Sequence, residues 1–502
     1  MSSSTNGFIQ ENFLLQSSLA EKLYHDVAAK QPIIDYHSHL SPFEIATNRK
    51  YENITRIWLS EDHYKWRAMR GAGVNERFIT GDATDEEKFQ AWAETVPQTV
   101  RNPLFHWTYL ELKNSFGVTE YLNPASASRI YNQCNELLSG EEHTARKFLE
   151  QYNVVYLCST DDPCDDLQYH HAIKADKEFN VGVAPSFRPD KAFAIHDTEN
   201  FLAYISRLSA ASGVSITDMD SLLSAMETRI DFFAAVGCKV ADHGLSQLPK
   251  NNAFTVDLDI ELKRFLATRG ETAFSDPDAF VFYILTSLCK MYHARGWVQQ
   301  FHLGAIRNNN TRLKLKLGAD AGFDSIGDYA QAERLSALLN ALDAEDKLSK
   351  TIIYNLNPAD NALFATMCGN FNDGSTKGKV QYGPAWWFLD QKNGMEQHLD
   401  ILSDVCLLST FVGMITDSRS LLSFSRHEYF RRILCNMMAN DMINGIIPND
   451  EQWMGDLLKK IGVQADFIQI GDFKGAAEPY MRSKMSPQLR QQFESLIDDL
   501  YE

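Results

Sequence analysis

A chain of 502 residues, 44% hydrophobic and 23% charged, has the composition of an ordinary soluble globular protein with a large core. Its 66 acidic residues outnumber its 48 Lys and Arg residues, and the net charge of −18 argues against nucleic acid or an anionic membrane as the main partner. The N-terminal residues show no basic segment followed by an apolar run, no stretch approaches 18 consecutive apolar residues, and the cysteines form no C-x-x-C pair. These features predict a cytoplasmic protein with reduced cysteines and no membrane attachment.

The first predicted element is the apolar run that opens the stretch PIIDYHSHLSP, residues 32–42. Alternate residues of a strand face the same way, so His37 and His39 would converge on one point where this strand ends. An isolated H-x-H pair is often only a surface turn with two unrelated histidines. The pair therefore indicates a metal site only if other segments bring further ligands to the same place.

Short apolar runs recur along the chain, and each ends in polar residues. With residues 33–39 there are eight such runs, and the others are 154–163, 181–190, 237–245, 297–307, 351–358, 380–388 and 411–419. Amphipathic segments of helical length lie between them, at 218–236, 278–295, 328–345, 393–409 and 424–440. Buried strands that alternate with helices predict a parallel sheet, and eight such units predict an α/β fold, the (β/α)8 TIM-type barrel.

The connection after the first strand is far too long for a single crossover. It contains helix signals, such as Pro103 at a first-turn position and Gly117 at the matching stop. We therefore predict a helical insertion or lid domain at 41–150, and a barrel built from residues 1–40 and 151–502 with helical extensions at both ends. The extra C-terminal helices are expected beyond residue 445.

In a barrel the catalytic groups lie where strands end and loops begin. Four of the 14 histidines fall at such ends, namely His37, His39, His243 and His302, and Asp417 ends the eighth strand, which neighbours the first in a closed barrel. Two imidazoles and a carboxylate suit one divalent metal ion with an open position, and Zn²⁺ is the ion we expect. The predicted ligands are His37, His39 and Asp417, whereas His243 fits a packing role.

The chain resembles the uronate isomerase (glucuronate isomerase) family of the amidohydrolase superfamily. Beyond the H-x-H pair, the resemblance lies in seven separated motifs, ITRIWLSEDHYKWRAMRGAGV, NPLFHWTYLEL, STDDPCDDLQYH, SFRPDK, FHLGAIRNNN, YGPAWWF and MITDSRSLLSFSRHEYFRRIL. It implies an aldose–ketose isomerase of hexuronate catabolism, which interconverts D-glucuronate with D-fructuronate and D-galacturonate with D-tagaturonate. Whether turnover needs the metal stays open.

The chemistry that the resemblance implies requires a base that moves a proton between C2 and C1 through a cis-enediol. Asp417 is the expected base. Arg419 lies two residues further on and would keep Asp417 ionised by charge proximity. His63 and Tyr64, both from the helical insertion, would act as proton shuttles or donors to the enediolate.

The hexuronate itself needs a carboxylate clamp and groups that hold its hydroxyls. Arg188 would bind the carboxylate through its guanidinium fork. Asp242 and His302 would hold hydroxyl groups, and Trp386 would cover one face of the sugar. The hexuronate is the one partner implied, with no nucleic acid and no membrane, and a homo-oligomer is left open.

Two other functions remain open from the sequence. One is a metal-dependent hydrolase or deaminase on the same scaffold, although the sixth strand ends in Asn355, Asn357 and Pro358 where such a site usually gains another histidine. The other is an inactive barrel that only binds sugar acids, although the metal, acid and base positions all carry competent residue types. Product formation, ammonia or acid release, and binding without turnover distinguish the three.

Overall fold

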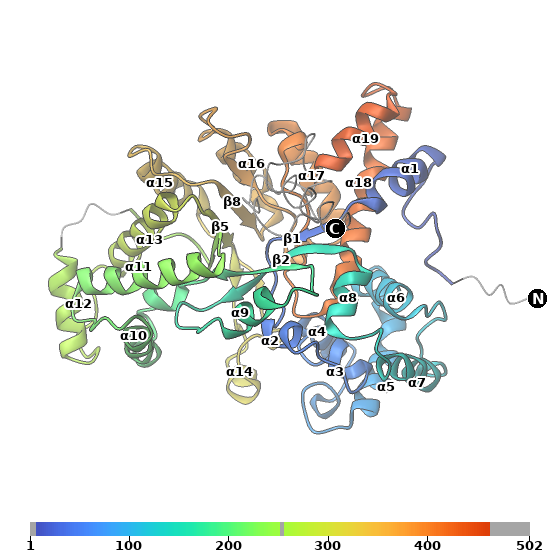
Figure 1. The fold of residues 1–502 in the computed structure, drawn as a ribbon, viewed down its shortest axis with the longest axis horizontal. Helices are drawn as coiled ribbons and strands as arrows, with labels where there is room; N and C mark the ends of the chain where they lie inside the picture. The colour runs from blue at the N-terminus through green and yellow to red at the C-terminus, as the bar shows by residue number, and fades with distance from the viewer. Residues whose placement is uncertain (1–6, 252–255, 462–502) are drawn as a thin grey trace, which may run out of the picture.

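Seven parallel strands form one curled sheet at the centre of the molecule. The structure, a computed structural model, describes residues 7–251 and 256–461 (Figure 1). The strand order is β1-β2-β3-β4-β5-β8-β9, so the strands that follow one another along the sheet also follow one another along the chain. The strands are β1 (Ile33–Asp35), β2 (Val154–Asp161), β3 (Gly182–Phe187), β4 (Val240–Leu245), β5 (Val298–Leu303), β8 (Thr351–Asn355) and β9 (Val380–Tyr382). A separate antiparallel pair, β6 (Ala305–Ile306) and β7 (Ser325–Ile326), follows β5.

The prediction of an eighth strand at 411–419 is wrong for the described structure. Residues 411–418 have no regular secondary structure, yet this segment lies beside the loop that follows β1. The Asp417 amide donates to the carbonyl of His37 (3.2 Å), and the His39 amide donates to the carbonyl of Ser418 (2.9 Å). Side chains also bond backbone groups that a strand ladder would otherwise use, since the Tyr36 hydroxyl donates to the carbonyl of Gly413 (3.1 Å). The segment is tied to β1 by these contacts rather than by a regular ladder.

Helices alternate with the strands, as the sequence predicts. They cover the sheet, and strands β3, β5 and β8 are buried along their whole length, as expected of a parallel sheet that helices enclose. These helices are α9 (Gln168–Ala175), α10 (Thr198–Ser212), α11 (Met219–Val236), α12 (Leu258–Ala267), α13 (Pro277–Ala294), α14 (Thr311–Leu317), α15 (Gln331–Asp343), α16 (Asn361–Gly369), α17 (Lys392–Val405) and α18 (Ser425–Ile443).

The long connection between β1 and β2 is helical throughout its regular parts. It contains α2 (Pro42–Ala46), α3 (Ile54–Trp58), α4 (His63–Gly71), α5 (Asp85–Thr95), α6 (Pro103–Phe116), α7 (Ala127–Leu138) and α8 (Ala145–Gln151). Figure 1 shows α3, α5, α6 and α7 gathered at one side of the molecule. Helix α6 begins at Pro103 and ends at Phe116, and Gly117 caps it with a φ of 65°, the left-handed value that favours glycine.

Further helices lie at the two ends of the chain. Helix α1 (Ser18–Lys22) packs against α18, and α19 (Glu451–Lys460) follows α18 (Figure 1). The predicted extension beyond these helices falls at residues 462–502, outside the described residues. Among the helices that the structure describes, none combines the length and the apolar character that a membrane crossing requires. All eight cysteines lie in the described part, and each is a free thiol.

Candidate active site

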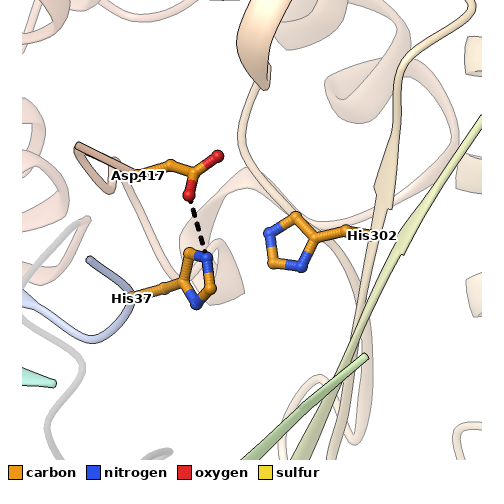
Figure 2. A group of neighbouring side chains, drawn as sticks. All are labelled: His37, His302 and Asp417. Carbon is orange, nitrogen blue, oxygen red and sulfur yellow. Dashed lines mark hydrogen bonds and ion pairs between the residues drawn. The ribbon is translucent and has the colours of Figure 1, made fainter. Parts of the chain in front are cut away.

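The two histidines of the H-x-H pair converge on Asp417. Strand β1 ends at Asp35, so His37 and His39 lie in the loop after the strand rather than on it. Their Nε2 atoms nevertheless lie 3.0 Å and 2.9 Å from the same oxygen of Asp417, Oδ1 (Figure 2 draws the His37 contact). The sequence predicts that strand geometry brings His37 and His39 together. In the structure, backbone hydrogen bonds between the loop after β1 and residues 417–418 bring the two histidines to Asp417.

His302, on β5, belongs to the same cluster. Its ring centroid is 4.4 Å from that of His37, and one ligand atom each from His37, His302 and Asp417 lie within 4.8 Å of one another. In Figure 2 a ring nitrogen of His302 faces the Asp417 carboxylate. Nδ1 of His302 is 2.7 Å from Oδ1 of Asp242, while its buried Nε2 has no hydrogen-bond partner among the described residues. An imidazole backed by a carboxylate, with its other nitrogen unused, is the usual form of a metal-binding histidine.

The position of Asp417 is imposed by its neighbour Thr416. The Thr416 amide donates to Oδ1 of Asp35 (2.9 Å), and Nη2 of Arg426 donates to the Thr416 carbonyl (2.5 Å). Arg426 is itself paired with Asp390, and all of these groups are buried. Asp417 has a φ of 43°, a left-handed value that is uncommon for a residue with a side chain. Such strain persists where the surroundings determine the conformation, as they do here.

Hydrogen bonds keep the Asp417 carboxylate ionised. Burial raises its pKa, but the bonds from His37 and His39 outweigh burial and hold the pKa well below its ordinary value. The indole Nε1 of Trp386 donates to Oδ2 of Asp417 (2.5 Å). Arg419, which was expected to supply the stabilising charge, has its closest described carboxylate partner in Asp320, at 3.5 Å. The two histidines therefore lower the pKa of Asp417, and the catalytic role expected of Arg419 stays a prediction.

Arg188 and Asp242 form an ion pair in which Asp242 is buried and Arg188 is partly exposed. Nη1 of Arg188 lies 3.0 Å from Oδ2 of Asp242, whose side chain has no exposed surface. The other oxygen of Asp242 holds His302, so both oxygens already face protein groups. Burial raises the pKa of Asp242, but Arg188, His37 and His302 together bring the pKa well below its usual range. The geometry makes Asp242 a support for Arg188 and His302, although its buried Oδ2 has no hydrogen-bond partner among the described residues. The contact with a substrate hydroxyl that the sequence assigns to Asp242 stays a prediction.

A cavity of about 270 Å³ opens on one side of this cluster. This volume is close to the lower end, about 300 Å³, of the range for pockets that bind small molecules. Five of the predicted site residues line it, namely His39, His63, Tyr64, Asp417 and Arg419. Trp386 and His302 join them through contact with Asp417 and with each other, their ring centroids being 4.8 Å apart.

His63 and Tyr64 come from the first turn of α4. Asp62 caps this helix by accepting the amides of Tyr64 and Lys65, and it also pairs with the Lys65 ammonium (2.5 Å), which is buried. The rings of His63 and Tyr64 stack at 4.7 Å. Burial lowers the pKa of His63 and raises that of Tyr64 well above its ordinary value. Both side chains are therefore neutral near pH 7, and each can donate a proton to an oxygen in the cavity.

Sequence reasoning missed several residues that support the site. Arg426 and Glu111 line the cavity, and Asp190 lies beside Arg188. Asp190 lies in the quoted motif SFRPDK and Arg426 in MITDSRSLLSFSRHEYFRRIL, so the signal was present in the sequence, but their roles depend on side-chain contacts across the fold.

Comparisons with known proteins agree on one family. The profile of the glucuronate isomerase family matches residues 5–466. A uronate isomerase of Flavobacterium johnsoniae is 49% identical over 461 residues, which cover 91% of this chain and 97% of that protein. One of Bacteroides thetaiotaomicron is 50% identical over 448 residues, covering 88% and 95%. The crystal structure of a uronate isomerase from Thermotoga maritima superposes with a TM-score of 0.84 at 32% identity, covering 90% of this chain and 97% of that one. The chain therefore belongs to the glucuronate isomerase family, whose members are enzymes that isomerise uronates.

Proposed function

We propose that this enzyme interconverts D-glucuronate with D-fructuronate and D-galacturonate with D-tagaturonate by proton transfer between C2 and C1. The observation that carries the proposal is the cavity in which an ionised carboxylate, Asp417, lies together with the neutral donors His63 and Tyr64. An aldose–ketose isomerisation needs this combination of a base for the C–H proton and donors for the developing enediolate oxygens.

In the proposed mechanism, Asp417 accepts the proton from C2 of the bound uronate and returns it to C1. Its Oδ2 receives the indole hydrogen bond of Trp386, which fixes the plane of the carboxylate during both transfers. Tyr64 donates to the enediolate oxygen, and His63, stacked on it, moves the second proton between O1 and O2. Arg188 orients the substrate through its carboxylate. Trp386 covers one face of the sugar.

The donor set fits one divalent metal ion. His37, His39 and Asp417 would hold it, with His302 as a further nitrogen ligand, and the unused buried Nε2 of His302 supports this assignment. Zn²⁺ is the ion we propose, because imidazole and carboxylate ligands with an open position suit it. When bound, the ion would polarise substrate oxygens as a Lewis acid.

We also propose that residues 411–418 complete an eight-membered (β/α)8 barrel in place of a regular strand, and that residues 41–150 act as its lid. The first point is supported by two backbone hydrogen bonds, from the His39 amide to the Ser418 carbonyl and from the Asp417 amide to the His37 carbonyl. The second is supported by His63 and Tyr64, which lie on α4 and line the cavity. The eight free cysteines favour a cytoplasmic enzyme. The acidic net charge of −18 favours a small molecule over nucleic acid or membrane as the partner.

The test is incubation of the purified protein with each uronate in turn, with the 2-keto product followed by chromatography. The same samples are assayed for released ammonia and acid, which a hydrolase or deaminase would produce. The comparisons do not favour that alternative, and the end of β8 carries Asn355, whose side chain bonds Asn361 (2.9 Å), in place of a further imidazole ligand. Uronate that binds without conversion would point to a binding protein.

A further inference from the structure

We propose that Asp190 and Gly244 are positioning residues that set the orientation of the Arg188 guanidinium, and with it the capture of the uronate carboxylate. The proposal rests on the proposed function, because it concerns the group that is expected to bind the substrate carboxylate. Neither residue has a role in the mechanism above, and neither lines the cavity around Asp417.

Asp190 uses both carboxylate oxygens to join the end of β3 to β4. It follows Arg188 by two residues, at the start of the 3-10 turn Asp190–Phe193. Its Oδ2 accepts from the Gly244 amide (2.8 Å) and from Nε of Arg188 (3.2 Å). Its Oδ1 lies 3.2 Å from Nδ1 of the buried His243. The two β4 residues fix the carboxylate, and the carboxylate in turn fixes the Nε edge of the guanidinium.

Gly244 provides the space that the guanidinium occupies. A Cβ on this residue would lie 1.9 Å from Nη2 of Arg188 and 3.0 Å from its Cζ, so any side chain here would displace the group. The φ of Gly244 lies outside the left-handed range, so the backbone conformation does not itself require glycine. The absence of a side chain therefore serves the packing of Arg188.

The guanidinium is consequently held on two edges. Asp190 accepts from Nε, Asp242 lies 3.0 Å from Nη1, and Nη2 packs against Gly244, so the protein contacts all three nitrogens. The Arg188 side chain is nevertheless 23% exposed, so part of it remains accessible to a substrate carboxylate. A guanidinium recognises a carboxylate through two parallel bonds only when its plane is correctly set, and a small rotation loses one of them.

The test compares Asp190→Asn and Gly244→Ala with the wild-type enzyme, and repeats both changes in an Arg188→Met background. Gly369→Ala is the matched glycine control, because a Cβ there meets nothing within 4 Å. Each single variant should raise KM for D-glucuronate by about 10-fold or more, the loss of one charged hydrogen bond, while kcat and metal content change much less. In the Arg188→Met background neither change should raise KM further, since the guanidinium is already gone.

Crystal structures of both single variants give a readout that does not depend on turnover. The guanidinium should leave its wild-type position in Gly244→Ala and lose its fixed plane in Asp190→Asn. The proposal is overturned if the guanidinium stays in place in both, or if the changes raise KM equally with and without Arg188. If Gly244→Ala does not fold, Asp190→Asn decides alone. A wild-type enzyme that converts no uronate would refute the proposed function, whereas a shift in Arg188 would still be seen in the crystals.

Discussion

Replacing Asp417 by Asn tests the assignment of the base most directly. The amide has nearly the shape of the carboxylate, but it carries no charge and cannot accept the C2 proton. If its oxygen stays near His37 and His39, its NH₂ group faces the indole N–H of Trp386, and the 2.5 Å hydrogen bond to that indole is lost. A general base contributes about 10²- to 10⁴-fold to the rate, which corresponds to about 2.7–5.5 kcal/mol of activation free energy. We therefore expect isomerisation to fall by at least about 100-fold.

Two measurements distinguish loss of the base from loss of the metal site. The first is the rate of uronate conversion together with metal content by elemental analysis. The second is exchange of the substrate C2 hydrogen in D₂O, which should disappear in the variant if the wild type shows it. Asp404→Asn, on the exposed side of α17, is the control for the substitution itself. Near-normal isomerisation by Asp417→Asn with metal bound would refute the reasoning, and the base would then be another residue.

Other perturbations give further expected outcomes. His37→Ala and His39→Ala should each leave less than one equivalent of bound metal in a folded protein, and full occupancy in both by elemental analysis would contradict the ligand assignment. Arg188→Met should raise KM for uronates by about 10- to 150-fold with a smaller change in kcat, because a hydrogen bond to a charged group contributes about 1.5–3 kcal/mol. Burial raises the pKa of Asp161, the last residue of β2, to about 7, so the native state holds this proton more tightly than the unfolded chain. The stability that this group contributes is present at low pH and is lost as the pH rises through about 7. The free energy of unfolding of Asp161→Asn should therefore increase relative to that of the wild type between about pH 4 and pH 7. A difference that stays constant across that range in denaturant titrations would argue against this assignment.

The sequence predicts the strands, their helices and the meeting of His37, His39 and Asp417 because each depends on local pattern and on chain order around the sheet. It fails at residues 411–419, whose apolar run has the composition of a strand. There the side chains of Asp35 and Tyr36 take backbone groups that a ladder would use, and no spacing rule reveals such contacts.

The roles of individual side chains were harder to predict than their location. Asp242 was predicted at the end of a strand, whereas it lies in the middle of β4 and is fully buried between Arg188 and His302. The hydroxyl contact expected of His302 stays a prediction, and this residue also belongs to the group of side chains that could hold a metal ion. Which atom of a side chain remains free depends on partners far away in sequence, and a single sequence carries no record of them.

The contact between His37 and Asp417 joins residues that are 380 positions apart. Closing a flexible loop of that length costs about 5 kcal/mol of chain entropy. The contact between His37 and Asp417 is therefore expected to form only after the intervening strands have docked. A ribosome must also complete nearly the whole chain before the second partner exists. Catalytic activity should therefore be among the last properties to appear during refolding, later than helix content. A nascent chain that stalls before residue 417 would contain His37 and His39 but would lack the Asp417 carboxylate that they contact.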